Sequence, residues 1–379
     1  MKCENELAYR LNFSGSPALT IGVELELQLL DREDCRLTPM APALLEALAQ
    51  SPWRERIRPE ISRTMVELCT GTHADHGTLR AELSELRTVL TAAAEDMDIL
   101  VAGGGAHPFQ RTPETGMLDD ARYRRLAASH GHHARQLTLF GLHFHLGCPD
   151  GDTAIYLTHR LGRFVPHFIA LAAASPFWRG EDTGFACARL SSVCAVPLTG
   201  HLPCVKDWRE FGRYFDRMRS FGIVESMQDF YWDIRPRPEL GTVEVRVCDT
   251  PLALERACDL AVLGQMLADY LLTEDVASPT ADDYATYPVN RYNACRHGLA
   301  GEFIDPSSGR RTSLRHDLLQ TLERLSRHAH RWHALEALER IERAAESGRS
   351  DADDLRDQHA AYGALERVAR FQAERWLES

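Results

Sequence analysis

The fold of this chain depends on the stretch Ile21-Gly-Val-Glu-Leu-Glu-Leu-Gln-Leu29. Apolar side chains occupy every second position and alternate with Gly22, Glu24, Glu26 and Gln28. This period of two predicts a β-strand with one apolar face and one face that carries two carboxylates. Adjacent side chains on one face lie roughly 7 Å apart, so the two acids repel each other unless a cation or solvent relieves the repulsion. Taken alone, the pattern is typical of the solvated face of an antiparallel sheet.

Three later segments repeat this design. Residues 64–68, 137–147 and 241–249 also alternate, and their polar faces carry Glu67, His143, His145, Glu244 and Arg246. An ordinary solvent face would mix Thr, Lys, Ser and Gln with little His. Glutamate oxygens suit Mg²⁺ or Mn²⁺ and tolerate one His among them, so the four strands together predict a metal site. Paired metals bridge phosphate oxygens, and Arg246 is placed to bind a phosphoryl group.

Composition limits the classes of partner. The chain has 379 residues, 44% of them hydrophobic and 26% charged, and a formal net charge of −12. This acidity argues against nucleic acid or an anionic membrane as the main partner. No stretch approaches the roughly 18 apolar residues of a membrane span, and the start lacks the apolar core of a signal peptide. The 10 cysteines form no C-x-x-C pair, so we expect reduced thiols and a cytoplasmic protein.

Helical periodicity supplies the rest of the expected architecture. It predicts helices from an N-cap at Thr78 to about Asp98, over 153–174 with a kink at Pro166, over 208–227, and over 252–272. A buried strand at 99–102 leads into Gly103, Gly104 and Gly105, where a close packing site and a substrate loop both remain open. The polar segment 112–136 is expected to be a helix and loop. We expect a single catalytic unit over 1–379, with 312–379 as a helical extension; its apolar helices allow a homodimer without requiring one.

Five motifs carry a resemblance to a known family. In chain order they are Gly22-Val-Glu-Leu-Glu, Val66-Glu-Leu-Cys-Thr-Gly, Gly105-Ala-His-Pro-Phe, Gly141-Leu-His-Phe-His-Leu-Gly and Thr242-Val-Glu-Val-Arg-Val-Cys-Asp. Together they resemble the type 2 glutamate–cysteine ligase family, over roughly residues 20 to 300. The resemblance implies an α+β, glutamine synthetase-like fold, in which a curved antiparallel sheet packs its outer face against helices. It also implies that ATP and Mg²⁺ bind on the concave face.

The resemblance further implies roles for individual residues. Glu24, His143 and Glu244 would hold the cation beside the transferred phosphate, whereas Glu26, Glu67 and Glu60 would hold a second cation near the substrate carboxylate. His145 and Arg246 would contact the phosphates of ATP or an acyl phosphate and so act in catalysis. The remaining candidates for binding phosphate or the substrate carboxylate are Arg235, Arg291 and Arg296, and for each of them a structural ion pair is an equal alternative.

The reaction implied by the resemblance has two steps. ATP phosphorylates a carboxylate, expected to be the γ-carboxylate of glutamate, and the amine of a second substrate such as cysteine then displaces phosphate to form an amide. Alignment and charge neutralisation suffice for this chemistry, and no nucleophilic side chain is needed. Two alternatives remain open at this stage. One is a phosphotransferase that acts on a guanidino or other nitrogen acceptor, and the other is a non-catalytic sensor of ATP or metal.

Overall fold

An antiparallel sheet of seven strands runs through the described residues in the order β10-β11-β5-β1-β3-β2, with β4 paired to β1. The computed structural model describes residues 11–110, 118, 124, 128, 131, 138–193, 196–274, 276 and 278–378. Most of the segment 112–136 therefore lies outside the described residues, including the helix and loop expected there. The strands of this sheet are β1 (Ile21–Asp31), β2 (Ile57–Pro59), β3 (Met65–Cys69), β4 (Ile99–Ala102), β5 (Gly141–Gly147), β10 (Ile234–Arg237) and β11 (Thr242–Asp249).

Strand β1 lies at the centre of the sheet, as its alternating sequence predicts. It pairs with β3 along one edge, and with β5 and then β4 along the other. The apolar side chains from Ile21 to Leu29 are buried in the main core. The predicted strand at 242–249 is β11, whose register against β5 shifts between Val245 and Cys248 at a bulge. Two-stranded sheets are formed by β6 (Phe177–Trp178) with β7 (Glu181–Asp182), β8 (Thr199–Gly200) with β9 (Tyr231–Trp232), and β12 (Glu302–Ile304) with β13 (Arg311–Ser313).

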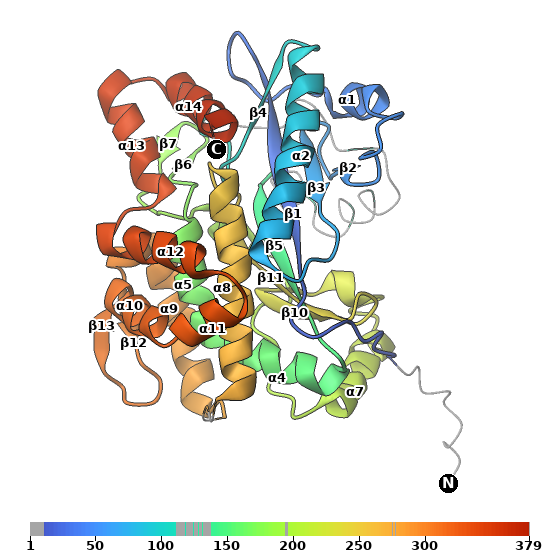
Figure 1. The fold of residues 1–379 in the computed structure, drawn as a ribbon, viewed down its shortest axis with the longest axis vertical. Coiled ribbons are helices and arrows are strands. Elements are labelled where there is room, and N and C mark those ends of the chain that lie inside the picture. The colour runs from blue at the N-terminus through green and yellow to red at the C-terminus, as the bar shows by residue number, and fades with distance from the viewer. Residues whose placement is uncertain are drawn as a thin grey trace.

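Helices cover the apolar face of the sheet, and Figure 1 shows α2 and α8 lying across it. One close approach is at Gly264 of α8, which packs directly on the ring of Phe144 from β5. The first half of the chain contributes α1 (Ala41–Ala47), α2 (His76–Glu95), α4 (Gly151–Leu161), η2 (Gly162–Phe164), α5 (Val165–Ala172) and α6 (Arg189–Val193). The second half contributes α7 (Trp208–Ser220), η3 (Met227–Asp229), α8 (Leu254–Thr273), α9 (Ala281–His297) and η4 (Gly298–Ala300). Among the described residues, no helix is both long and apolar enough to cross a membrane.

Helix boundaries depart from the sequence predictions in four places. The helix expected over 208–227 is α7, which ends at Ser220. The carboxylate of Asp75 accepts the Thr78 N–H and caps α2, so Thr78 lies inside the helix rather than at its N-cap. The helix expected over 153–174 breaks into α4 and α5 around a 3₁₀ turn just before Pro166. Helix α9 was not predicted, because Pro288 lies inside it and interrupts the helical pattern.

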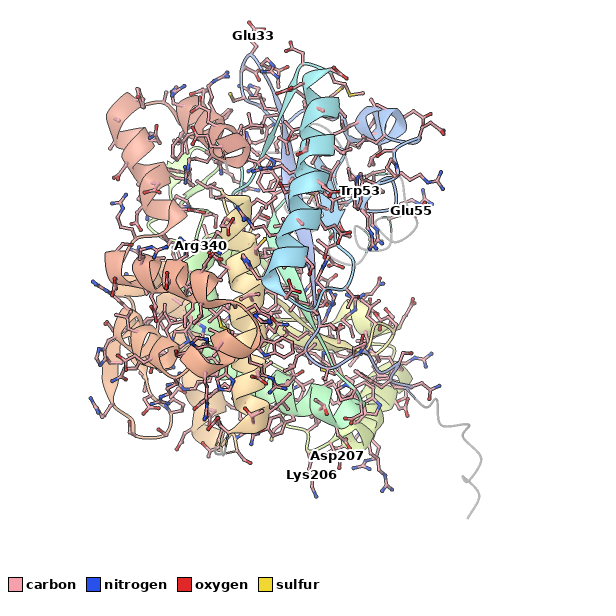
Figure 2. All side chains as sticks on the ribbon, viewed as in Figure 1. Glu33, Trp53, Glu55, Lys206, Asp207 and Arg340 are labelled. Atoms are coloured by element: carbon pink, nitrogen blue, oxygen red, sulfur yellow. The ribbon has the colours of Figure 1, made fainter. Side chains whose placement is uncertain are left out.

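The predicted helical segment after residue 312 consists of α10 (Leu314–Glu323), α11 (Ser326–Arg331), α12 (Leu335–Ser347), α13 (Asp351–Tyr362) and α14 (Leu365–Glu378). Arg340 of α12 ties this segment to α8, because its Nη2 lies 2.7 Å from Asp259 Oδ1 and 2.8 Å from Glu255 Oε1 (Figure 2). Trp376 of α14 is buried in the main core. The C-terminal helices therefore pack on the sheet's helical layer.

The three glycines after β4 form a packing site, which answers one question left open by the sequence. A Cβ at Gly103 would lie 2.2 Å from the Pro251 carbonyl oxygen, and one at Gly105 would lie 2.3 Å from the Asp249 carboxylate carbon. At Gly104, where φ is +97°, a Cβ would lie 2.0 Å from Gln372 Nε2. Glycine is required here because neighbouring segments leave no room for a side chain.

The contact between α8 and the sheet predicts the effect of one substitution. In Gly264→Ala, the new methyl group would lie 2.3 Å from Phe144 Cε2, and the Phe144 ring is fully buried and cannot move aside into solvent. We expect the free energy of unfolding to fall by about 1–3 kcal/mol, measured by urea denaturation.

Gly212→Ala is the matched control for Gly264→Ala. Gly212 also lies inside a helix, α7, but a Cβ there meets nothing within 4 Å. Because alanine is the better helix former, we expect this change to stabilise the protein by about 0.5–1 kcal/mol. Equal effects of the two substitutions would contradict the packing described for α8.

Candidate active site

The cross-strand register gathers the predicted acids and histidines on the face of the sheet opposite the helices. Glu26 of β1 lies directly across from Glu67 of β3, and Glu24 lies directly across from His143 of β5. His145 of β5 pairs in turn with Glu244 of β11. Because side chains opposite each other in an antiparallel pair lie close together, three rows of polar groups meet over the middle of the sheet.

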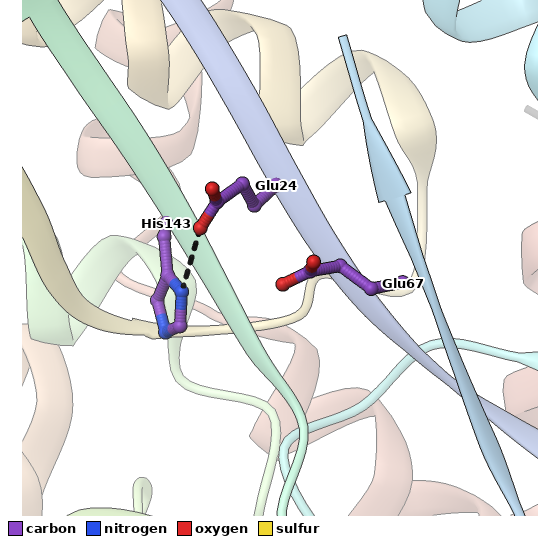
Figure 3. A group of neighbouring side chains, drawn as sticks. All are labelled: Glu24, Glu67 and His143. Atoms are coloured by element: carbon purple, nitrogen blue, oxygen red, sulfur yellow. Dashed lines mark ion pairs between the residues drawn. The ribbon is translucent and has the colours of Figure 1, made fainter. Parts of the chain in front are cut away.

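Two groups of side chains that share Glu67 have the spacing of metal ligands. The first consists of Glu24, Glu67 and His143, shown in Figure 3, and His143 Nδ1 lies 3.4 Å from Glu24 Oε2. The second consists of Glu26, Glu60 and Glu67, so Glu67 belongs to both. In each group one ligand atom per residue lies within 4.8 Å of the others. Glu244 was predicted to join Glu24 and His143 around one cation. It lies farther from His143 than Glu24 does, with 3.9 Å between His143 Nδ1 and Glu244 Oε1.

The electrostatics of these groups suit a cation. Burial and the charge of Glu60 raise the pKa of Glu26 to about 8, and burial with the charges of Glu24 and Glu60 raises the pKa of Glu67 well above its ordinary value. Burial and the nearby Arg246 lower the pKa of His143 to about 4, so its imidazole is neutral, the form that binds metals. Burial alone would raise the pKa of Glu24, but hydrogen bonds with His143 and His145 outweigh it and hold that pKa well below its usual range. A divalent cation would relieve the repulsion among these carboxylates.

Glu244 is the centre of a positively charged cluster. Its carboxylate is fully buried and accepts from Arg235 Nε at 2.7 Å, from Arg237 Nη1 at 3.0 Å and from Arg246 Nη1. Burial by itself would raise the pKa of Glu244, but the charges of Arg235 and Arg246 hold it well below its usual range. A third group of possible metal ligands, Glu24, His145 and Glu244, lies at the edge of this cluster. The structure therefore brings Glu244 to the predicted site, with its oxygens already engaged by arginines.

Two cavities open onto this face and meet at Glu24 and Arg58. The first, of about 300 Å³, is lined by the two carboxylate groups, Arg246 and Trp232, and we call it the Glu26 cavity. The second, of about 290 Å³, is lined by Gly22, Gly71, Thr242 and His145, and we call it the His145 cavity. The two cavities are thus separate spaces that share one acidic residue, Glu24.

The contacts of three arginines that were predicted to bind a ligand differ from those of Arg246. They are Arg235, Arg291 and Arg296. All three nitrogens of Arg235 donate within the protein, to Glu244 and to the carbonyl oxygens of Met227, Gln228 and Phe230. Arg291 binds the buried Asp233, with Nε 2.6 Å from Oδ2, and does not line either cavity. Arg296 lies over the Phe185 ring and likewise lines neither cavity. For Arg235 and Arg291 the contacts are those of the structural ion-pair alternative.

Sequence reasoning missed three arginines of this site, Arg58, Arg189 and Arg237. Arg237 had a signal, because it lies two residues after Arg235 on the same face of β10, but the intervening prolines obscure the strand pattern. Arg58 directly precedes the Pro59-Glu60 pair and is paired in register with Glu67. Arg189 comes from an irregular segment whose sequence shows no periodicity, so only the folded chain reveals its place.

The chain is similar in sequence to one known family. The model of glutamate–cysteine ligase family 2 (GCS2) matches residues 20–370. A protein of Janthinobacterium sp. named "Putative glutamate--cysteine ligase 2" is 46% identical over 367 residues, 97% of this chain and 99% of that protein. A protein of the same name from Methylibium petroleiphilum is 49% identical over 314 residues, 83% of this chain and 85% of that protein.

Solved structures share the fold. The chain superposes on a glutamate–cysteine ligase of Francisella tularensis, solved in complex with AMP, with a TM-score of 0.72 at 14% identity, covering 97% of this chain and 90% of that one. A bifunctional glutathione synthetase from Pasteurella multocida gives a TM-score of 0.69 at 14% identity, over 95% of this chain and 52% of that one. The expected α+β fold, a sheet with helices on its outer face, is confirmed.

The paired carboxylate groups predict a Mg²⁺ effect on stability. We expect Mg²⁺ to raise the melting temperature of the wild type, by an amount that corresponds to about 2.7 kcal/mol at a concentration 100-fold above its Kd. Glu67→Gln should remove most of this effect, because Glu67 belongs to both groups, while it melts no lower than wild type without Mg²⁺ since it relieves repulsion. Differential scanning fluorimetry with and without Mg²⁺ measures both.

A control comes from the other face of the sheet. His76, Glu255 and Asp259 also have the spacing of metal ligands, but the Arg340 guanidinium already pairs with both carboxylates and Arg80 pairs with Glu255. Glu255→Gln should therefore leave the Mg²⁺ effect unchanged. If Glu67→Gln kept the full effect, or Glu255→Gln lost it, the assignment of the cation to Glu67 would be wrong.

Proposed function

Because the chain belongs to glutamate–cysteine ligase family 2, we propose that it is an ATP-dependent ligase that joins a carboxylate to an amine. The acid is the γ-carboxylate of glutamate, the amine is that of an amino acid such as cysteine, and the amide forms by way of an acyl phosphate. The observation that carries this proposal is the pair of carboxylate groups beside Arg246 in the wall of the Glu26 cavity, which meets the His145 cavity at Glu24. That arrangement suits a reaction whose main demand is neutralising phosphate charge.

The residues fit ATP and Mg²⁺ by their chemistry. Hard divalent cations prefer carboxylate oxygens, and Glu26, Glu60 and Glu67 place their carboxylates close enough together to raise the pKa values of Glu26 and Glu67. We propose that Glu24, Glu67 and His143 hold one Mg²⁺ (or Mn²⁺) and that Glu26, Glu60 and Glu67 hold a second, with Glu244 at the edge of the first. Bound as its Mg²⁺ complex, ATP would supply the phosphoryl group that activates the carboxylate.

The surrounding side chains position the charges that the reaction needs. Glu244 binds Arg246 through Nη1 and so holds its guanidinium against the wall of the Glu26 cavity, where it would stabilise charge on the transferred group. His145 Nδ1 lies 3.0 Å from the Thr242 hydroxyl, and this contact turns Nε2 toward Glu24 Oε1, 3.5 Å away. We propose that the nucleotide occupies the His145 cavity and the acid the Glu26 cavity.

Arg235 takes a different role from the one first expected. Because its nitrogens are engaged within the protein, we propose that it fixes Glu244 and acts on the ligand only through Arg246. Arg291 and Arg296 remain predicted ligand-binding residues that the cavities described above do not support. The comparisons do not favour the phosphotransferase or sensor alternatives.

The proposal extends to the setting of the enzyme. We propose that it works in the cytoplasm as a single catalytic unit of residues 1–379, in which 312–379 form a helical extension. All eight cysteines that the structure describes are free thiols, which agrees with a reducing compartment. Gel filtration at several concentrations would test for a homodimer.

Phosphate release tests the function. With Mg²⁺, ATP, glutamate and a panel of amines that includes cysteine, we expect phosphate only when both an acid and an amine are present. Glu24→Gln should lower kcat by at least about 100-fold, because it removes charge that holds the phosphate side of the site. Its melting temperature without Mg²⁺ should fall, because the ionised Glu24 carboxylate is stabilised by hydrogen bonds with His143 and His145.

Glu85→Gln, on the exposed side of α2, is the surface control and should retain full activity. ATP turnover that ignores every carboxylate would overturn the ligase proposal. A stable phosphorylated nitrogen compound would instead identify a phosphotransferase, and tight ATP binding without turnover would identify a sensor.

A further inference from the structure

A third cavity, of about 310 Å³, opens between α4, α9 and α10, and we call it the α9 cavity. It is as large as the Glu26 cavity and the His145 cavity, and it shares no lining residue with either of them. Three arginines and three aspartates line it, and the reaction described above uses none of them. They are Arg160, Arg163, Arg324, Asp283, Asp305 and Asp317.

One pair of these charges is neutralised within the protein. Arg163 and Asp317 form a bidentate ion pair, with both N···O distances 2.9 Å. The other two arginines have no acidic partner within the described part of the chain. The Arg160 guanidinium donates to two neutral oxygens of the segment after α8, and the Arg324 side chain makes neither a hydrogen bond nor an ion pair there. Two positive charges in the wall of the cavity are therefore left without a counterion.

Asp283 and Asp305 likewise form no ion pair with the residues that the structure describes. Asp283 Oδ2 accepts from the Thr280 N–H at 2.7 Å and from its hydroxyl at 3.0 Å. Asp305 accepts from the hydroxyl groups of Ser307 and Ser308. These hydrogen bonds fix the two carboxylates without neutralising them. Because charges of both signs line one cavity without pairing, a ligand that carries both charges would match its wall.

An apolar space adjoins this charged one. A pocket of about 40 Å³ shares Pro279 and Pro306 with the α9 cavity, and its own wall includes Leu202, Tyr287 and Phe303. We call it the Tyr287 pocket. A space of this size holds about three water molecules, which is close to the volume of a branched aliphatic side chain. The two spaces together therefore offer opposite charges beside a small apolar recess.

We propose that the α9 cavity and the Tyr287 pocket together bind an α-amino acid with an aliphatic side chain. Its carboxylate pairs with Arg160 and Arg324, its ammonium group pairs with Asp283 and Asp305, and its side chain enters the Tyr287 pocket. A ligand with a single charge would leave either the arginines or the aspartates unpaired. A polyphosphate would also be repelled by the two carboxylates. The site is separate from the spaces in which we place the nucleotide and the acid.

Helix α9 links this site to the Glu26 cavity. Asp283 lies in the first turn of α9, and one and two turns further on Tyr287 and Arg291 donate to the buried Asp233 carboxylate, at 2.5 Å and 2.6 Å. Asp233 lines the Glu26 cavity, and its carbonyl oxygen accepts from the Arg246 backbone N–H at 3.0 Å. A ligand that holds α9 in this position also favours this position of Arg246, so we expect it to activate the enzyme.

Leucine and two analogues that each lack one charge test the site. The analogue 4-methylpentanoate lacks the amino group, and 3-methylbutylamine lacks the carboxylate. Isothermal titration calorimetry of the full-length wild type should show one leucine bound per chain. Leucine should bind at least about 10-fold more tightly than either analogue, the lower end of the range for hydrogen bonds to charged groups.

Two variants alter the charged part and the apolar part separately. Arg324→Gln removes an exposed charge that has no partner in the described chain. Gly162→Leu fills the Tyr287 pocket, because a Cβ at Gly162 lies 3.9 Å from Tyr287 Cε2 and clashes with nothing. Each should weaken leucine binding at least about 10-fold. If Gly162→Leu fails to fold, Arg324→Gln carries the test alone.

Two further variants are the matched controls. Gly162→Ala adds a methyl group in ordinary contact with the Tyr287 ring and leaves most of the pocket open. Arg315→Gln removes a charge from the same helix, α10, outside the cavity. Both should bind leucine as the wild type does.

Phosphate release measures the link to the Glu26 cavity. Leucine should raise kcat of the wild type at least about fivefold, the lower end of the usual coupling between two sites. Arg324→Gln should keep the basal activity of the wild type and lose this activation. Tyr287→Phe keeps the ring in the pocket but loses the hydroxyl bond to Asp233, so it should bind leucine without being activated.

The outcomes separate this site from the ligase proposal. Leucine binding that persists unchanged in folded Arg324→Gln or Gly162→Leu, equal binding of leucine and either analogue, or no binding to the wild type would overturn the site. Binding that both variants lose, with phosphate release indifferent to leucine, would support the site and refute its link through α9. The same binding result in a wild type that releases no phosphate with any acid and amine would support the site while it refutes the ligase proposal.

Discussion

The opposition of Glu26 and Glu67 across two paired strands is the constraint around which this molecule is built. Like charges directly opposite each other in a sheet destabilise it, and here Glu67 is also buried and Glu26 half-buried. The opposite face of the same strands supplies the compensation, because β1 alone buries five apolar side chains against the helices. The sheet can therefore hold an unfavourable charge arrangement on one face because its other face is a tightly packed core.

Acidic and basic side chains occupy different parts of the polar face of the sheet. The carboxylates of Glu26, Glu60 and Glu67 gather over β1 and β3, while three arginines gather over β10 and β11 around Glu244. The boundary between the two halves runs along His143 and His145 of β5. A reacting group that carries negative charge would sit along this boundary, between bound cations on one side and fixed guanidinium groups on the other. The geometry thus favours alignment over any covalent role for a side chain.

The sequence predicted the strands that carry the site better than the contacts between them. Strands β1, β5 and β11 could be read from the period of two, because each has one face in the core. The partners of Glu244 could not be read, since they depend on the register of β10 against β11 and on a bulge that no local pattern reveals. Helix α9 was missed for a local reason, its internal Pro288. Arg189 was missed because its position depends on a residue far away in the sequence, Asp249, 60 residues further along the chain.

The strict alternation of β1 has a consequence for how the chain finds its native state. A slip of one residue against β5 would turn Glu24 and Glu26 toward Phe144 and α8, and bring their apolar neighbours out to water. Two ionised groups in that core would cost far more than their mutual repulsion does on the polar face. A pairing of β1 with β5 that is shifted by one residue is therefore strongly disfavoured during folding. Glu24 and Glu26 weaken the native pairing, but they weaken this shifted pairing more.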